Sequence, residues 1–191
     1  MKTFFLILLS VALGSYYFTK DAVATKSTMS VSKKYTYLAL GDSYTIGETV
    51  PATDNFPHQA VSLLQKGGVA ITPPQIIATT GWTTNEIEKA IAGEQNNKTI
   101  LPSYDFVSLL IGVNNQYRGR SLENYRIEFE ELLKKAIRFA GNNTSHVVVI
   151  SIPDWGVTPF AKGRNQEAIA NEIDAYNAAN KEIATRYQVS Y

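Results

Sequence analysis

The chain has 191 residues, a formal net charge of +1 and a hydrophobic fraction of 45%. This composition excludes an intrinsically disordered chain, and the balanced charge leaves no basic field that could hold nucleic acid. The length fits one domain. Because the sequence has no cysteine, disulfide bonds, thiolate catalysis and cysteine-ligated metal centres are excluded.

The first residues predict a secretory signal peptide over 1–24. An uncharged apolar run over 3–14 follows Lys2, and Ala22-Val23-Ala24 has the pattern of a cleavage site. An uncleaved membrane anchor is the alternative, since the charge-free stretch 3–19 approaches the length of a spanning helix. We therefore expect a bacterial protein that is secreted, periplasmic or attached to the cell envelope, without a stable membrane span. Residues 25–34 are rich in Ser, Thr and Lys and predict a linker.

Residues 35–191 predict strands that alternate with helices. Apolar runs that end at turn residues predict strands over 35–40, 75–80, 105–111 and 146–152. Apolar residues at helical spacing, with caps at Thr83, Ser121 and Gly141, predict helices over 56–66, from 83 onward, over 122–140 and over 165–187. Residues 188–191 look like the start of a fifth strand. This alternation predicts a three-layer α/β/α domain with a flavodoxin-like parallel sheet of five strands, the fifth truncated.

Polar residues follow three of the predicted strands at the point where each strand ends. In an open parallel sheet, the carboxyl ends of the strands form the binding site. Ser43, in Gly41-Asp42-Ser43-Tyr44, is a candidate nucleophile. The backbone N–H groups of Ser43 and Gly81 and the side-chain amide of Asn114 could donate hydrogen bonds to an oxyanion. Each element alone also fits a plain turn or a loop cap.

Together, Gly41-Asp42-Ser43-Tyr44, Gly81 and Gly112-Val113-Asn114-Asn115 resemble the SGNH or GDSL family of serine esterases and lipases. The similarity runs from about Tyr35 to the last residue. It implies that Ser43 is the nucleophile and that the Ser43 N–H, the Gly81 N–H and the Asn114 side chain form the oxyanion hole. It also implies hydrolysis of carboxylic esters through an acyl-enzyme, with no cofactor. Acetylated sugars, short acyl esters and lipids all fit as substrates.

One block of the family pattern is missing. The family carries an Asp-x-x-His near its C-terminus, which supplies the general base, and this sequence has no Asp-x-x-His and no histidine after His146. We therefore expect the sequence to be a fragment of a longer enzyme. A catalytically silent binding domain on the same fold is the alternative. A flavodoxin-like nucleotide binder ranks last, because Asp42 would repel a phosphate group.

The remaining candidates have weaker support. His146 opens the fourth predicted strand, so it belongs at the amino edge of the sheet and a structural role is expected. His58 follows the Ser43 loop, but a surface position in the first turn of a helix is favoured over a general base. Asp154 follows the fourth strand, and a turn role is favoured there. Trp82 and Trp155 could flank the substrate, although core packing is the commoner role.

Overall fold

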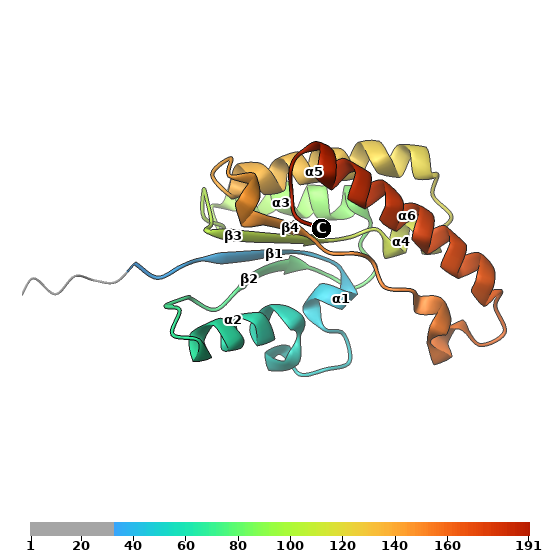
Figure 1. The fold of residues 1–191 in the computed structure, drawn as a ribbon, viewed down its shortest axis with the longest axis horizontal. Coiled ribbons are helices and arrows are strands. Elements are labelled where there is room, and N and C mark those ends of the chain that lie inside the picture. The colour runs from blue at the N-terminus through green and yellow to red at the C-terminus, as the bar shows by residue number, and fades with distance from the viewer. Residues whose placement is uncertain (1–32) are drawn as a thin grey trace, which may run out of the picture. The chain divides into compact units, whose positions relative to one another are not determined.

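The computed structural model describes residues 33–191, which form an α/β domain with a four-stranded parallel sheet (Figure 1). The predicted signal peptide and most of the predicted linker lie outside the described residues. The strands are β1 (Tyr37–Gly41), β2 (Gln75–Ala78), β3 (Phe106–Leu110) and β4 (Val147–Val149). The α-helices are α1 (Ser43–Ile46), α2 (Phe56–Lys66), α3 (Thr84–Asn97), α4 (Val113–Tyr117), α5 (Leu122–Phe139) and α6 (Gln166–Arg186). Short 3-10 helices are η1 (Ala52–Asp54), η2 (Thr144–His146), η3 (Trp155–Val157) and η4 (Pro159–Ala161).

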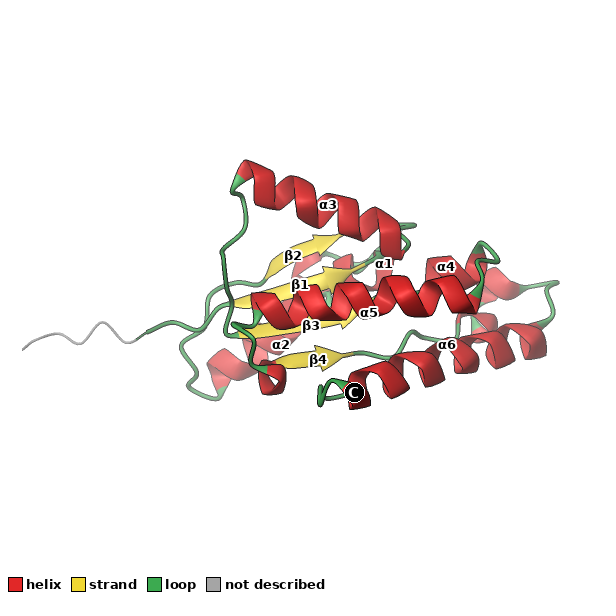
Figure 2. Cartoon of the chain, turned by 90° about the horizontal axis from the view of Figure 1, so that it is seen from above, coloured by secondary structure: helices red, strands yellow, loops and turns green. Residues whose placement is uncertain are grey.

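The strands lie in the order β2-β1-β3-β4 and all run in the same direction (Figure 2). Leu40 of β1 pairs with Ile77 on one side and with Leu109 on the other. The strand order reverses between β1 and β3, so a crevice is expected beyond the carboxyl ends of these two strands. The predicted parallel α/β fold is confirmed.

The fourth and fifth strands differ from the prediction. β4 is shorter than predicted at both ends. At its start, His146 belongs to η2, which the Asn143 side chain caps, and at its end the strand stops at Val149 instead of residue 152. The expected fifth strand is a single parallel bridge between Ser190 and Val148. In this bridge the Val149 N–H donates to the Ser190 carbonyl oxygen at 2.9 Å.

Most of the hydrophobic core lies on one side of the sheet, beneath α3, α5 and α6. Its fully buried side chains include Leu38, Leu40, Ile87, Ile91, Leu109, Phe129, Leu132, Leu133, Ile173 and Ile183. A smaller cluster of Tyr37, Ala39, Val61 and Ile71 lies on the α2 side. In Figure 1 the helices α3, α5 and α6 lie above the sheet and α2 lies below it. Within residues 33–191, no helix is long and apolar enough to span a bilayer.

Two short helices that the sequence did not predict lie just beyond the strands that flank the crevice. The Asp42 carboxylate starts α1 by accepting a hydrogen bond of 3.1 Å from the Tyr44 N–H. Gly112 starts α4 at a φ of +131°, and a Cβ atom there would collide with the Tyr125 hydroxyl. A side chain at Gly112 is therefore excluded both by the backbone angle and by the close approach. These two starts place Ser43 and Asn114 at the carboxyl edge of the sheet.

Candidate active site

A cleft of about 470 Å³ lies at the carboxyl edge of the sheet and contains both Ser43 and Asn114. Side chains from α1, α4 and the segment after β4 form its walls. The lining residues are Ser43, Tyr44, Glu48, Thr49, Val113, Asn114, Tyr117, Trp155, Thr158 and Phe160. The structure therefore brings two of the three predicted site residues into one cavity.

Ser43 is half-buried and is the first residue of α1. The next three N–H groups of this turn all bond to Asp42. Tyr44 donates to the Asp42 side chain, and Thr45 and Ile46 donate to its carbonyl oxygen. Within residues 33–191, no group accepts a hydrogen bond from the Ser43 N–H. This N–H is therefore available to a ligand oxygen in the cleft.

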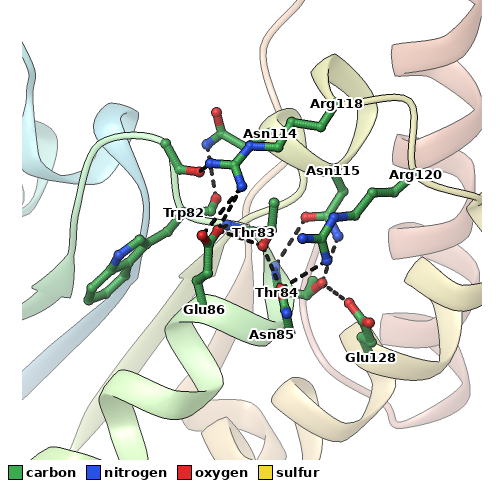
Figure 3. Close-up of polar contacts among 11 residues, drawn as sticks. Trp82, Thr83, Thr84, Asn85, Glu86, Asn114, Asn115, Arg118, Arg120 and Glu128 are labelled. Carbon is green, nitrogen blue, oxygen red and sulfur yellow. Dashed lines mark hydrogen bonds and ion pairs between the residues drawn. The ribbon is translucent and has the colours of Figure 1, made fainter.

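The Asn114 amide is held against the turn that contains Gly81. Its Nδ2 donates to the Trp82 carbonyl oxygen at 2.9 Å, and the Arg118 guanidinium donates to the Gly81 carbonyl oxygen at 2.5 Å (Figure 3). Gly81 has a φ of +81° and does not line the cleft. Its N–H has no acceptor in the described part of the chain. The two bonds attach this turn to α4.

A second set of polar contacts fixes the start of α3 to α4 (Figure 3). Asn115 accepts from the Thr84 N–H at 3.1 Å and donates to the Thr84 hydroxyl at 2.7 Å. Glu86 accepts from Thr83 in the predicted capping box and also pairs with Arg118 at 3.2 Å. These contacts, first those with Thr83 and then that with Arg118, lower the pKa of Glu86 to about 2. The turn between β2 and α3 is therefore held to the helix that carries Asn114.

Asp42 lies behind the serine and is completely buried. Burial raises the pKa of its carboxyl group from 3.8 to about 7, although the hydrogen bond from Tyr44 acts in the opposite direction. Within residues 33–191, neither its Oδ2 atom nor the nearby buried hydroxyl of Thr45 has a hydrogen-bond partner. The Asp42 side chain therefore caps the turn, and its carboxyl group is partly protonated at neutral pH.

Neither histidine lines the cleft. His58 lies in the first turn of α2, with its Nδ1 atom 2.8 Å from the Asn55 side-chain oxygen. His146 lies at the amino edge of the sheet, where its ring packs against Phe106 at 5.9 Å. Asp154 accepts a hydrogen bond of 2.7 Å from the Gly156 N–H and so closes a turn. Within residues 33–191, no group of three or more His, Asp or Glu side chains could bind a metal ion.

Most of the apolar side chains that line the cleft were not predicted from the sequence. Trp155 lines the cleft, whereas Trp82 packs against the main core. Tyr117 and Phe160 join Trp155 in the wall, although they come from different segments, α4 and η4. No periodic pattern links these three positions, so nothing in the sequence could have grouped them.

The strand order, with a serine on the turn after β1 and an asparagine on the turn after β3, defines an SGNH-hydrolase fold. Residues 39–191 match the GDSL-like lipase/acylhydrolase family, and the chain belongs to that family. Membership supports ester hydrolysis as the general activity. No protein of curated function matches the sequence.

Solved structures of esterases share the fold. AlinE4, an SGNH-hydrolase family esterase, is similar with a TM-score of 0.63 and 15% identity, over 84% of this chain and 76% of AlinE4. Axe2, an acetylxylan esterase from Geobacillus stearothermophilus, has a TM-score of 0.62 and 18% identity, over 81% and 74% of the two chains. A lipase/acylhydrolase from Enterococcus faecalis has a TM-score of 0.60 and 18% identity, over 81% and 74%.

Proposed function

We propose that the chain is a serine hydrolase that cleaves carboxylic esters through an acyl-enzyme on Ser43. The observation that carries the proposal is the shared cleft of Ser43 and Asn114. In the described structure the N–H groups of Ser43 and Gly81 have no protein acceptor, and one Asn114 amide proton remains after the bond to Trp82. These are three donors of the kind that stabilise an oxyanion.

The chemistry has two steps. The Ser43 Oγ bonds to the ester carbonyl carbon and passes its proton to a general base, a role that neither histidine of residues 33–191 is placed to fill. The bond from that carbon to the alcohol oxygen then breaks, and the base gives the proton to the departing alcohol. Water then attacks the acyl-enzyme, releases the carboxylic acid and returns a proton to Ser43. In both steps the negative charge that develops on the carbonyl oxygen would be shared by the Ser43 N–H and the Asn114 amide, which line the cleft. The Gly81 N–H would join them from the adjoining turn, which Asn114 and Arg118 attach to α4.

A second candidate is a binding domain with the same cleft and no turnover. The observation that favours it is the position of the histidines, since neither His58 nor His146 lines the cleft. Without a base, a serine hydroxyl is a weak nucleophile near neutral pH.

Labelling with a fluorophosphonate and hydrolysis of p-nitrophenyl acetate distinguish the two candidates. We expect slow labelling and slow hydrolysis in the unmodified chain, because neither histidine lines the cleft, and neither reaction in Ser43→Ala. Ser103→Ala is the matched control, because Ser103 is exposed and lies in the loop before β3. If the folded chain shows neither labelling nor hydrolysis, the binding domain is the better description. Turnover that persists in Ser43→Ala would exclude Ser43 as the nucleophile.

We also propose a secreted or envelope location, which rests on residues 1–24 alone. Mass spectrometry of the mature N-terminus tests it. Cleavage after Ala24 is expected, and a protein that keeps Met1 in the cytoplasmic fraction would refute this location.

A further inference from the structure

Three aromatic side chains line the cleft together with the polar side chains of Tyr44, Glu48 and Thr49. We call Tyr117, Trp155 and Phe160 the aromatic wall. The ring centroids of Tyr117 and Trp155 lie 5.3 Å apart, and those of Phe160 lie 5.9 Å from Tyr117 and 5.8 Å from Trp155. All three rings are therefore in mutual contact and present one continuous apolar surface.

Polar contacts with neighbouring side chains fix the shape of the aromatic wall. The Trp155 indole N–H donates to the Gln116 side-chain oxygen at 2.7 Å, and the Gln116 amide donates to Glu172 of α6 at 2.6 Å. The Arg164 guanidinium lies 5.1 to 5.5 Å from the three ring centroids and donates to the Tyr117 hydroxyl at 3.1 Å. The wall is therefore already ordered in the absence of a ligand, which lowers the entropy cost of binding.

Two members of the aromatic wall are exposed, whereas Trp155 belongs to the main core. Phe160 is 65% exposed and Tyr117 is 42% exposed. An exposed aromatic surface in a cleft is typical of a ligand site.

Several polar groups around the cleft already have partners. Asn114 donates to Trp82, the Thr158 hydroxyl donates to the Trp155 carbonyl, and Glu48 accepts from the Thr80 hydroxyl. Glu48 in the cleft and Arg164 beside the aromatic wall carry opposite charges, so these two residues give the site no net charge that would favour an ionic ligand.

We propose that the aromatic wall binds the uncharged, apolar acyl group of the ester and that Phe160 sets the preference for acyl chain length. This inference rests on the proposed function, because it assumes that the ester carbonyl lies at Ser43. It makes a medium-length acyl ester the preferred substrate class over an acetylated sugar.

The test measures binding without turnover. A series of 2-alkanones, from butanone to 2-nonanone, presents a carbonyl group and an apolar chain but cannot be hydrolysed. We expect the affinity measured by titration calorimetry to rise two- to fourfold with each added methylene, because a fully buried methylene contributes about fourfold. In Phe160→Ala the gain in affinity per added methylene should fall to less than half of the wild-type gain for the longer ketones. Phe160→Leu should retain most of it.

Val157→Ala is the matched control, since Val157 is an exposed apolar residue of the neighbouring η3 that does not line the cleft. It should leave the series unchanged. A flat series, or equal effects of Phe160→Ala and Val157→Ala, would overturn the inference. Tighter binding of an acetylated methyl xyloside than of 2-nonanone would overturn it in favour of a sugar ester. Ketone binding does not require a reactive Ser43, so this result is independent of the labelling experiment.

Discussion

The Asn114 side-chain amide donates a hydrogen bond of 2.9 Å to the Trp82 carbonyl oxygen, across the gap between α4 and the turn after β2. This contact uses one of the two protons on Nδ2 and fixes the plane of the amide. The second proton remains for a ligand. The same bond therefore positions the amide and joins the two turns that flank the cleft.

Asn114→Ala should lower kcat by about 10² to 10³ with little change in KM, because one oxyanion donor is lost. The measurement is steady-state hydrolysis of p-nitrophenyl acetate. The folded state should persist, since Asn114 makes a single hydrogen bond to the protein. An unchanged kcat would mean that the residue only braces the turn at Trp82.

Asn115→Ala should act on stability instead. Asn115 is fully buried and makes two hydrogen bonds with Thr84. Its removal leaves the Thr84 N–H without an acceptor, whereas the Thr84 hydroxyl keeps its bond to Glu128. We expect the free energy of unfolding to fall by roughly 1–3 kcal/mol. Urea denaturation of both variants provides the comparison, because Asn114→Ala should lose less than about 1 kcal/mol. Equal losses in the two variants would contradict the division of roles between these adjacent asparagines.

Asp42→Asn should change the pH dependence of stability. In the folded state burial raises the pKa of Asp42 from 3.8 to about 7. The protonated form is favoured in the fold, so the stability that it contributes is complete below pH 3.8 and is lost as the pH rises through about 7. The wild-type chain should therefore lose up to about 4 kcal/mol relative to Asp42→Asn between pH 4 and 8.

The readout is the slope of unfolding free energy against pH, which is not affected by a constant offset from the new amide group. Parallel curves for the two proteins would show that the Asp42 carboxyl is not perturbed. Tyr125 does not interfere in this range, because burial raises its pKa well above 10.

Val148→Thr should improve solubility. Val148 is 38% exposed in β4, and its pairing on the outer side is the single bridge to Ser190. An exposed apolar strand at a sheet edge favours aggregation. Threonine keeps the β-branched shape and adds a polar group. Light scattering at increasing protein concentration should show a later onset of aggregation than in the wild-type chain, whereas Val157→Thr, outside any strand, should change it less.

The regular elements were predictable because each carries a local signal. α2 has the predicted bounds, and α3 begins at the predicted capping box of Thr83 and Glu86. The strands were found as apolar runs. The short helices α1 and α4 were missed, because four or five residues hold no periodicity. The Asp42 cap of α1 is a local contact that also fits a plain turn, and α4 begins at Gly112, which Tyr125 approaches from a distant part of the chain.

The candidate site was predictable only where it follows the ends of strands. Ser43 and Asn114 were placed in one cleft by the rule for parallel sheets, and the structure has both there. The aromatic wall could not be foreseen, since Tyr117 and Phe160 reach Trp155 from distant parts of the chain. Their meeting depends on how α4 packs near η3 and η4, which no local pattern encodes.

The unequal division of the core between the two sides of the sheet has a consequence for hydrogen exchange. The cluster between α2 and the sheet is small, whereas α5 packs against much of the main core. Amides of α2 should therefore exchange through local opening, while those of α5 should exchange only when the whole domain unfolds. The helix α1 connects β1 to the α2 side, so Ser43, the proposed nucleophile, should lie at the boundary between a unit that opens locally and one that opens only on global unfolding.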